Sequence, residues 1–530
     1  MSGTAIDRVF ERRLAGLINS REPEPLSRGR RGLEKESLRV TPAARIAHSP
    51  HPRALGAALT NPAITTDYSE ALPELVSPTF ESSEDLLDWL RQLHGFVYRN
   101  LGDELLWPAS MPCELAGDAD VPIADYGRSH QGLFKQVYRR GLLTRYGGMM
   151  QAIAGVHFNY SFPLRFWPLW AELLQQQRSD AAFISTCYFD LLRNYRRHGW
   201  VVSYLFGASP ALCRSFLQGR TDAELREWQA ATVYGPDATS LRMSDLGYRN
   251  RNQAAVAVSV NSLDEYLRDL LHAVRTPHPP FAALGVKVDG EYRQLNANVL
   301  QIENEYYSYI RPKRVPRSGE LTGQALARGG VEYVEVRALD LDPFEPLSVS
   351  ESQLRFMEAL LALLLIKGSE PLSNSAQEEL DHNHLLVARH GRRRGLLLQR
   401  DGRPTPLVQW VSELFDQMQG VCELLDQQHP QRGYAAALAE QRQKLQQPEL
   451  LPAARLQQSL LEAEADFPSW VLHLAGQQRA SGLATGMQPA MLEEFTAMAQ
   501  DSLEQQARLE AATRGSFDDY LRRRFDGQRS

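Results

Sequence analysis

Two stretches of the chain carry carboxylates inside patterns that alternate like β-strands. Residues 32–40 read GLEKESLRV and residues 331–337 read VEYVEVR. Because side chains alternate between the two faces of a strand, Glu34 and Glu36 share a face with the apolar Leu38, as on a core-directed face. A buried carboxylate is costly unless a cation balances it. Carboxylates gathered around metal ions beside a fixed cation are suited to phosphate chemistry.

The second stretch supplies such a cation. Glu335 and Arg337 lie on one face of the expected strand, and an arginine keeps its charge in proteins. Simpler alternatives stay open for both stretches. The first could be an edge strand with solvated glutamates, since exposed glutamate is the common case. The second could hold a Glu335–Arg337 ion pair on a solvent-exposed sheet face.

Further candidate ligands occur in two other segments. Residues 64–78, ITTDYSEALPELVSP, contribute Asp67 and Glu74, and residues 151–163, QAIAGVHFNYSFP, contribute His157. A lone histidine in an apolar strand is usually a core residue, so His157 gains interest only beside acidic partners. The full set of candidate metal ligands is Glu34, Glu36, Asp67, Glu74, His157 and Glu335. Carboxylate oxygens suit Mg²⁺ or Mn²⁺ better than zinc, and so many acids favour more than one ion.

Regular elements must position these residues, and the sequence predicts several. Ser82 and Ser262 are expected N-caps of helices, the second within a capping box. Asp289–Gly290 is expected to turn a hairpin within residues 285–295. Residues 356–366 are apolar nearly all round, which indicates a buried helix. Other expected elements are helices up to about residue 18 and over 55–60, 82–97, 132–146, 166–205, 262–274 and 405–530, a strand continuing toward 298–307, and a basic turn-rich segment over 311–320.

Composition bounds the class of protein. The 530 residues are 43% hydrophobic and 23% charged, as in ordinary globular proteins, and the net charge of -6 argues against a general nucleic-acid binder. The N-terminus lacks the apolar segment of a signal peptide, and no apolar run is long enough to span a bilayer. Four scattered cysteines without a CxxC pair favour buried reduced thiols. We therefore expect a cytoplasmic protein without a membrane partner.

Common nucleotide-binding and hydrolase motifs are absent from the sequence. There is no GxxxxGK[ST], GxGxxG, HExxH or GxSxG. The chain instead resembles the proteobacterial glutamate–cysteine ligases, also called γ-glutamylcysteine synthetases. The resemblance runs in order from about residue 28 to about residue 345 and is carried by RGLEKESLRV, ALTNPAITTDYSEALPELVSP, GDELLWPASMPC, QAIAGVHFNYSFP, YLFGASPALC, TSLRMSDLGY, NVLQIENEYYSYIRPKRVPRSGE and ARGGVEYVEVRALDLDPF.

This resemblance implies an α+β fold like that of glutamine synthetase, in which a curved antiparallel sheet forms a funnel surrounded by helices. It implies ATP-dependent joining of the γ-carboxyl of L-glutamate to the amino group of L-cysteine through a γ-glutamyl phosphate. The products would be γ-glutamylcysteine, ADP and phosphate, in the first step of glutathione synthesis. The implied metal is Mg²⁺, which would bind as more than one ion and which Mn²⁺ could replace. ATP is the implied co-substrate.

The resemblance also assigns roles to particular residues. The six candidate ligands match the family's metal ligands, and Arg337 matches the arginine that faces the transferred phosphoryl group. The matches for substrate binding are Tyr138, Tyr248 and Tyr307, which would line the cysteine pocket, and Arg242 and Gln151, which would hold substrate.

The expected organisation is a catalytic core over residues 1–400 with a helical region over residues 401–530 packed on it, acting as a monomer. The C-terminus lacks the extra domain of the fused bifunctional forms, so glutathione synthetase activity is not expected. Two other functions stay open. One is a related carboxylate–amine ligase with another amine acceptor, and the other is a non-catalytic sensor of Mg²⁺–ATP.

Overall fold

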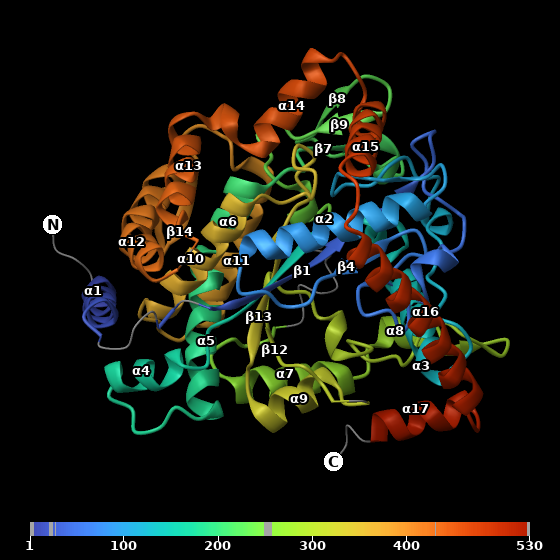
Figure 1. The fold of residues 1–530 in the computed structure, drawn as a ribbon, viewed down its shortest axis with the longest axis horizontal. Helices are drawn as coiled ribbons and strands as arrows, with labels where there is room; N and C mark the ends of the chain where they lie inside the picture. The colour runs from blue at the N-terminus through green and yellow to red at the C-terminus, as the bar shows by residue number, and fades with distance from the viewer. Residues whose placement is uncertain are drawn as a thin grey trace.

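A six-stranded antiparallel sheet lies at the centre of the molecule (Figure 1). The computed structural model describes residues 5–20, 25–26, 28–247, 257–317, 319–429 and 431–526. In spatial order the strands are β12 (Ile310–Lys313), β13 (Tyr333–Leu339), β6 (Val156–Ser161), β1 (Arg30–Glu36), β4 (Pro73–Val76) and β3 (Ile64–Thr66). Helices surround this sheet, so the predicted α+β class with an antiparallel sheet is confirmed.

The pairing register gathers the predicted acids on one face of the sheet. Directly opposed residues on neighbouring strands project from the same face. The opposed pairs are Glu36 and Glu74 between β1 and β4, Glu34 and His157 between β1 and β6, and Asn159 and Glu335 between β6 and β13. A polar band therefore crosses the four central strands.

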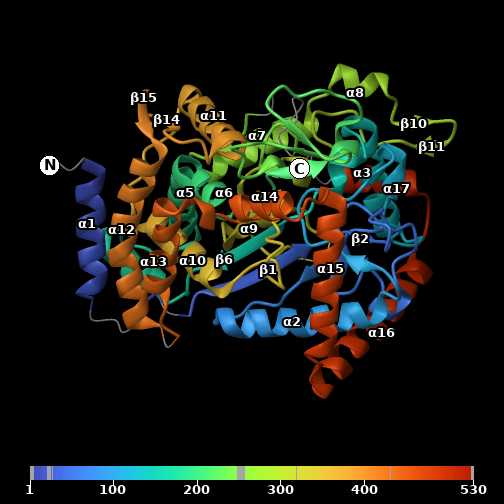
Figure 2. The ribbon, with the colours of Figure 1, turned by 90° about the horizontal axis from the view of Figure 1, so that it is seen from above.

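The opposite face of the sheet is largely apolar and covered by helices. Leu33 on β1 and Phe158 on β6 are opposed in the register and almost completely buried. α2 (Ser83–Asn100) runs along β1, and α10 (Glu351–Ile366) packs against α2 (Figure 2). The predicted buried helix is confirmed in α10, where every residue from Phe356 to Ile366 is buried. This apolar layer holds the strands rigidly beneath the polar band.

Several local predictions are confirmed by their hydrogen bonds and dihedral angles. The Ser82 hydroxyl accepts from the backbone N–H of Asp85 at the start of α2, and the Ser262 hydroxyl caps α7 (Leu263–Arg275) in the same way. Asp289 and Gly290 both have positive φ, as a type I′ hairpin turn between β10 (Lys287–Val288) and β11 (Glu291–Tyr292) requires. The remaining helices are α1 (Ala5–Ile18), α3 (His130–Tyr146), α4 (Phe166–Leu173), α5 (Ala181–His198), α6 (Trp200–Phe206), α7 (Leu263–Arg275), α8 (Pro279–Ala283), α9 (Thr322–Gly329), α11 (Asn374–His390), α12 (Leu407–Gln428), α13 (Tyr434–Gln446), α14 (Pro452–Glu462), α15 (Phe467–Ala484), α16 (Pro489–Ala512) and α17 (Phe517–Asp526).

The stretch 32–40 is not one continuous strand as expected. β1 ends at Glu36, although the backbone N–H groups of Ser37 and Arg39 still donate to the carbonyls of Pro73 and Ala71. The chain then enters β2 (Arg39–Val40), which pairs with β5 (Leu105–Leu106) outside the main sheet. Leu38 therefore packs in the core while Glu36 faces the polar band.

Two further expectations are wrong, and a third is wrong only at its start. Residues 55–60 contain only the end of a 3₁₀ turn at Arg53–Leu55, and residues 298–307 form a 3₁₀ turn at Glu303–Glu305 and no strand. Residues 310–313 are a strand, although 311–320 were expected to be turn-rich. Pro312 is tolerated there because β12 lies at the sheet edge. The N–H that proline lacks is therefore not needed for hydrogen bonds between central strands.

The C-terminal helices pack on the rest of the molecule. One hydrophobic cluster contains buried side chains from Phe10 through to Phe495. A second cluster joins α3 to α17, with Phe134 and Leu521 in its centre and Tyr138 at its edge. The four cysteines are buried and free, as expected. Among the described residues, no helix combines the length and the apolar character needed to cross a membrane.

Candidate active site

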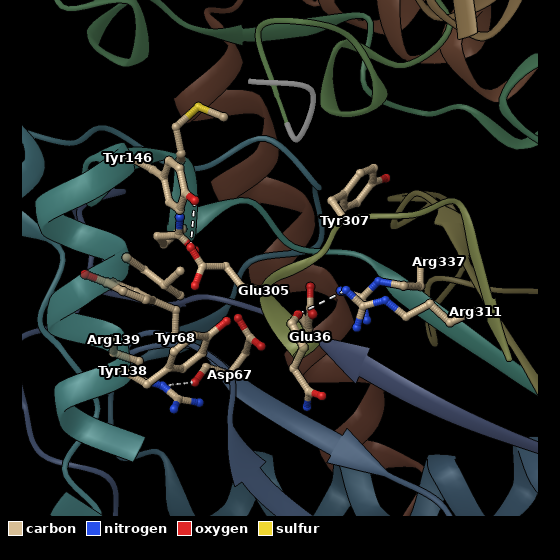
Figure 3. Close-up of a pocket in the computed structure, with 14 residues that line it drawn as sticks. Glu36, Asp67, Tyr68, Tyr138, Arg139, Tyr146, Glu305, Tyr307, Arg311 and Arg337 are labelled. Carbon is tan, nitrogen blue, oxygen red and sulfur yellow. Dashed lines mark hydrogen bonds between the residues drawn. The ribbon is translucent and has the colours of Figure 1, made fainter. Parts of the chain in front are cut away.

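A cavity of about 140 Å³ opens over the polar band. Figure 3 shows Glu36 and Asp67 between two walls, with Tyr138 of α3 on one side and Arg337 of β13 on the other. Six of the predicted site residues line it, and they are Glu36, Asp67, Tyr138, Gln151, Tyr307 and Arg337. The other lining residues are Tyr68, Arg139, Leu142, Tyr146, Met150, Asn304, Glu305 and Arg311.

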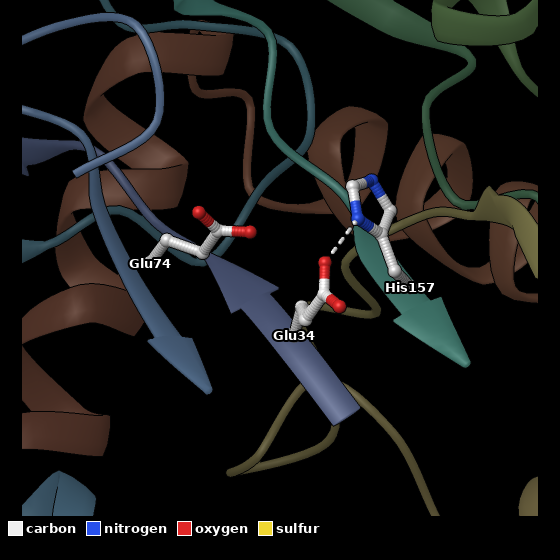
Figure 4. A group of neighbouring side chains, drawn as sticks. All are labelled: Glu34, Glu74 and His157. Atoms are coloured by element: carbon white, nitrogen blue, oxygen red, sulfur yellow. Dashed lines mark hydrogen bonds and ion pairs between the residues drawn. The ribbon is translucent and has the colours of Figure 1, made fainter. Parts of the chain in front are cut away.

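Three more of the predicted ligands form a compact group beside this cavity. One ligand atom each from Glu34, Glu74 and His157 lies within 4.8 Å of the other two. Figure 4 shows the three side chains turned toward one another from β1, β4 and β6. His157 Nδ1 lies 3.1 Å from Glu34 Oε2, and Asn159 donates to Glu34 Oε1 at 2.9 Å. Two carboxylates and an imidazole thus lie close enough together that they could hold a metal ion.

The same imidazole connects this group to Glu36. His157 Nε2 lies 3.6 Å from Glu36 Oε1, and the backbone N–H of Gly155 donates to Glu36 Oε2 at 2.7 Å. Burial raises the pKa of Glu36, although His157 acts in the opposite direction. Burial also raises the pKa of Glu74 well above its ordinary value, with the neighbouring charges of Glu34, Asp67 and Glu36 adding to the effect. The carboxylates of these residues repel one another, and a cation bound among them would stabilise their charged forms.

Glu335 is held differently, by cations of the protein itself. Lys313 donates to its Oε1 at 2.9 Å and Arg337 donates to its Oε2 at 3.3 Å. Burial alone would raise the pKa of Glu335, but Lys313 and Arg337 hold it well below its ordinary value. Burial also favours the neutral form of Glu34, yet its hydrogen bond with His157 brings its pKa below the usual range.

Two predicted substrate residues stand apart from the cavity lining. Arg242 is 1% exposed, and one guanidinium nitrogen donates to the backbone carbonyl of Arg337 at 3.0 Å while another lies 3.4 Å from Asp340 Oδ1. Through these contacts Arg242 supports the backbone of β13. Tyr248 lies outside the residues that the structure describes.

A comparison with known families shows the family of this chain. The model of the glutamate–cysteine ligase family matches residues 14–387. The chain belongs to the glutamate–cysteine ligase family. Members of this family are ATP-dependent ligases that catalyse the first step of glutathione synthesis, and this chain is such an enzyme.

Individual relatives from this family match nearly the whole chain. The glutamate–cysteine ligase of Alcanivorax borkumensis is 46% identical over 517 residues, which cover 97% of this chain and 98% of the relative. That of Azotobacter vinelandii is 46% identical over 520 residues, 97% of each chain. The crystal structure of the Francisella tularensis glutamate–cysteine ligase, solved in complex with AMP, superposes with a TM-score of 0.89 at 34% identity and covers 96% of this chain and 99% of its own.

Sequence reasoning missed several residues of this ligase site. Arg311 lies opposite Glu335 in the register of β12 and β13, and its guanidinium lines the cavity. Arg139 follows Tyr138 on α3 and donates to the carbonyl of Asp67 at 2.6 Å. The alternation of Arg311 and Lys313 in RPKR was a strand signal, but the proline and basic residues favoured a turn.

Proposed function

We propose that this site joins the γ-carboxyl of L-glutamate to the amino group of L-cysteine through γ-glutamyl phosphate, with ATP converted to ADP and phosphate. The observation that carries the proposal is the row of register-paired acids beside Arg337 on one sheet face. A carboxylate is a poor electrophile, so phosphorylation is needed to give it a good leaving group. Family membership supports ATP as the co-substrate.

Divalent cations would complete the site. We propose that the site binds more than one Mg²⁺ ion and that Mn²⁺ can replace Mg²⁺. The proposed ligands are Glu34, Glu36, Asp67, Glu74, His157 and Glu335. The donor set is dominated by carboxylate oxygens, which these hard cations prefer. The raised pKa values of Glu36 and Glu74 support the same assignment, because a bound cation would relieve the repulsion among the acids. When bound, such ions screen phosphate charge and align the nucleotide.

Arginine and lysine side chains contribute the remaining positive charge. Arg337 would face the transferred phosphoryl group, where a planar guanidinium can bind two oxygens at once. Arg311 lines the same cavity and would share the charge that develops during transfer. Lys313 and Arg337 keep Glu335 ionised, so this ligand is ready to bind a cation without losing a proton. Arg242 would act as a positioning residue, through its hydrogen bond to the Arg337 carbonyl.

The aromatic wall suits the second substrate. Tyr138 and Tyr307 would line the pocket for the cysteine side chain, with Tyr248 as a third proposed member, and Gln151 would hold substrate. The hydroxyl of Tyr307 donates to Met243 Sδ at 3.4 Å, which orients the ring. Aromatic walls also exclude water, and an acyl phosphate hydrolyses readily if water reaches it before the amine does.

An assay of ATP hydrolysis with the two amino acids tests this assignment. Phosphate release should be slow with cysteine alone, limited with glutamate alone, and fast with both. A reaction that proceeds equally well without cysteine would contradict an amine-acceptor role for cysteine. Bound Mg²⁺–ATP with no turnover would indicate the sensor alternative.

A related ligase with another amine acceptor is the second candidate. Competition between cysteine, 2-aminobutyrate and other amines separates the two, because the acidic band would be shared and only the tyrosine wall would differ. That the enzyme acts as a monomer in the cytoplasm, without nucleic-acid or membrane partners, stays a prediction.

A further inference from the structure

A second polar cavity lies away from the ligase site, between α6, α13, α14 and the loop that leaves β13. Its volume is about 260 Å³, and it shares no lining residue with the ligase cavity. α13 and α14 both lie in the upper part of the molecule in Figure 1. Charged side chains of both signs line it, and they are Asp342, Glu345, Glu440, Lys444 and Arg455.

These charges face one cavity without pairing. Within the described ranges, none of the five forms an ion pair at 4.0 Å or less. Lys444 is 9% exposed, and its ammonium donates to the carbonyl of Leu205 at 3.3 Å and lies 5.0 Å from the centre of the Phe206 ring. A compact ammonium has three donors, so this environment leaves Lys444 incompletely satisfied.

The acidic and basic side chains come from different elements of the cavity wall. Asp342 and Glu345 belong to the loop after β13, whereas Lys444 is on α13 and Arg455 on α14. Glu440 lies at the exposed rim, where Ser352 donates to it. Burial raises the pKa values of Asp342 and Glu345 and lowers the pKa of Lys444 to about 8, and the opposite charges around the cavity act against these shifts.

We propose that this cavity binds a small zwitterion that carries both an ammonium and a carboxylate, such as an amino acid or a dipeptide. Its ammonium would lie between Asp342 and Glu345, and its carboxylate would bind Lys444 and Arg455. Asp342 Oδ1 already accepts from the backbone N–H of Phe344 at 3.0 Å. A zwitterion would add charge-assisted hydrogen bonds at both of its ends. The cavity has room for a ligand of this size.

The position of this zwitterion site connects it to the ligase site through a short segment. Asp342 lies two residues after Asp340, which accepts hydrogen bonds from Ser209 at 2.6 Å and Ser240 at 3.0 Å and contacts Arg242. Arg242 in turn binds the carbonyl of Arg337. A ligand on Asp342 would therefore contact the segment that continues the catalytic strand.

Calorimetric titration of the full-length enzyme with glycylglycine tests the proposal. We expect saturable binding that weakens about tenfold or more in Lys444→Met and in Arg455→Gln, since each loses one charged contact to the carboxylate. Arg455 is exposed, so Arg455→Gln should fold even if Lys444→Met does not. Arg508→Gln, an exposed arginine on α16, is the matched control and should bind as the wild type does.

Methylammonium and acetate serve as probes that carry only one of the two charges. Neither should saturate at concentrations where glycylglycine does. The proposal is overturned if glycylglycine does not bind, if it binds equally to the wild type and Arg455→Gln, or if acetate or methylammonium alone binds as tightly.

Discussion

Arg337 donates to Oε2 of Glu335 at 3.3 Å, and both residues lie on one strand at the floor of the ligase cavity. Glu335 is 1% exposed, so this is not the solvent-exposed ion pair that the sequence left open. A register shift follows Val336 in the pairing of β13 with β6, at the point where Arg337 projects. β-Bulges re-aim side chains in this way next to active sites.

Arg337→Lys should lose most of the activity although the charge is kept. An ammonium cannot span two phosphoryl oxygens as a guanidinium does, and loss of one preorganised contact costs on the order of 3 kcal/mol, about a hundredfold in rate. The loss should fall on kcat, with the KM for ATP little changed. Steady-state kinetics measure both, with the melting temperature as a check on folding. A stable variant with near wild-type kcat would remove Arg337 from phosphoryl transfer.

Glu335→Gln should shift the Mg²⁺ dependence of activity to higher concentrations. Glutamine keeps the size and one acceptor oxygen but loses the charge that holds a cation. Titration of activity against Mg²⁺ after chelator treatment measures the shift. Glu332→Gln is the matched control, because Glu332 is half exposed and lies just before the same strand. Identical titration curves for both variants would exclude Glu335 from the metal site.

Tyr520→Ala should raise the KM for cysteine several-fold with little change in kcat. The Tyr520 ring on α17 contacts His130 and Phe134 on α3, with ring centres 5.3 and 6.4 Å apart, and α3 carries Tyr138 in the wall of the cavity. Loss of this packing should loosen the wall without touching the acids. Leu492→Ala, at an exposed position on α16, is the control. A uniform loss of kcat with an unchanged KM would contradict the specific role of α17.

Lys35→Met should remove a pH dependence of stability. Lys35 lies between Glu34 and Glu36 in sequence but faces the apolar side of β1, where burial lowers its pKa to about 7. Between pH 7 and 9 the unfolded chain keeps this proton while the folded protein loses it, so the free energy of unfolding rises with pH. The rise due to Lys35 is about 2 kcal/mol.

Urea unfolding at pH 7 and pH 9 measures this difference. The wild type and Lys287→Met, which changes an exposed lysine, should show the rise, and Lys35→Met should lack it. Equal pH dependence in all three proteins would show that Lys35 remains fully protonated in the folded state.

Local patterns in the sequence predicted much of this structure. The serine caps of α2 and α7, the Asp289–Gly290 turn and the apolar character of α10 depend on neighbouring residues, which the sequence displays directly. The alternation around Glu34 and Glu335 predicted the two strands that carry the acids.

Local patterns could not predict which strands pair or in which register. That Glu36 lies opposite Glu74 depends on the register of β1 with β4, which no local pattern specifies. The pairing after the end of β1 joins Arg39 of β2 to Leu106 of β5, which lies far away in the sequence. Arg311 was missed because its strand is a proline-containing edge.

Transfer of an ¹⁸O label from glutamate tests the central claim most directly. Glutamate labelled in its γ-carboxylate is incubated with the enzyme, Mg²⁺, ATP and cysteine, and the products are analysed by mass spectrometry. If γ-glutamyl phosphate forms, the bridging oxygen leaves with the phosphoryl group, so each inorganic phosphate carries one ¹⁸O beside unlabelled ADP. Unlabelled phosphate, or label in AMP with release of pyrophosphate, would contradict phosphoryl transfer to the γ-carboxylate in this acidic site.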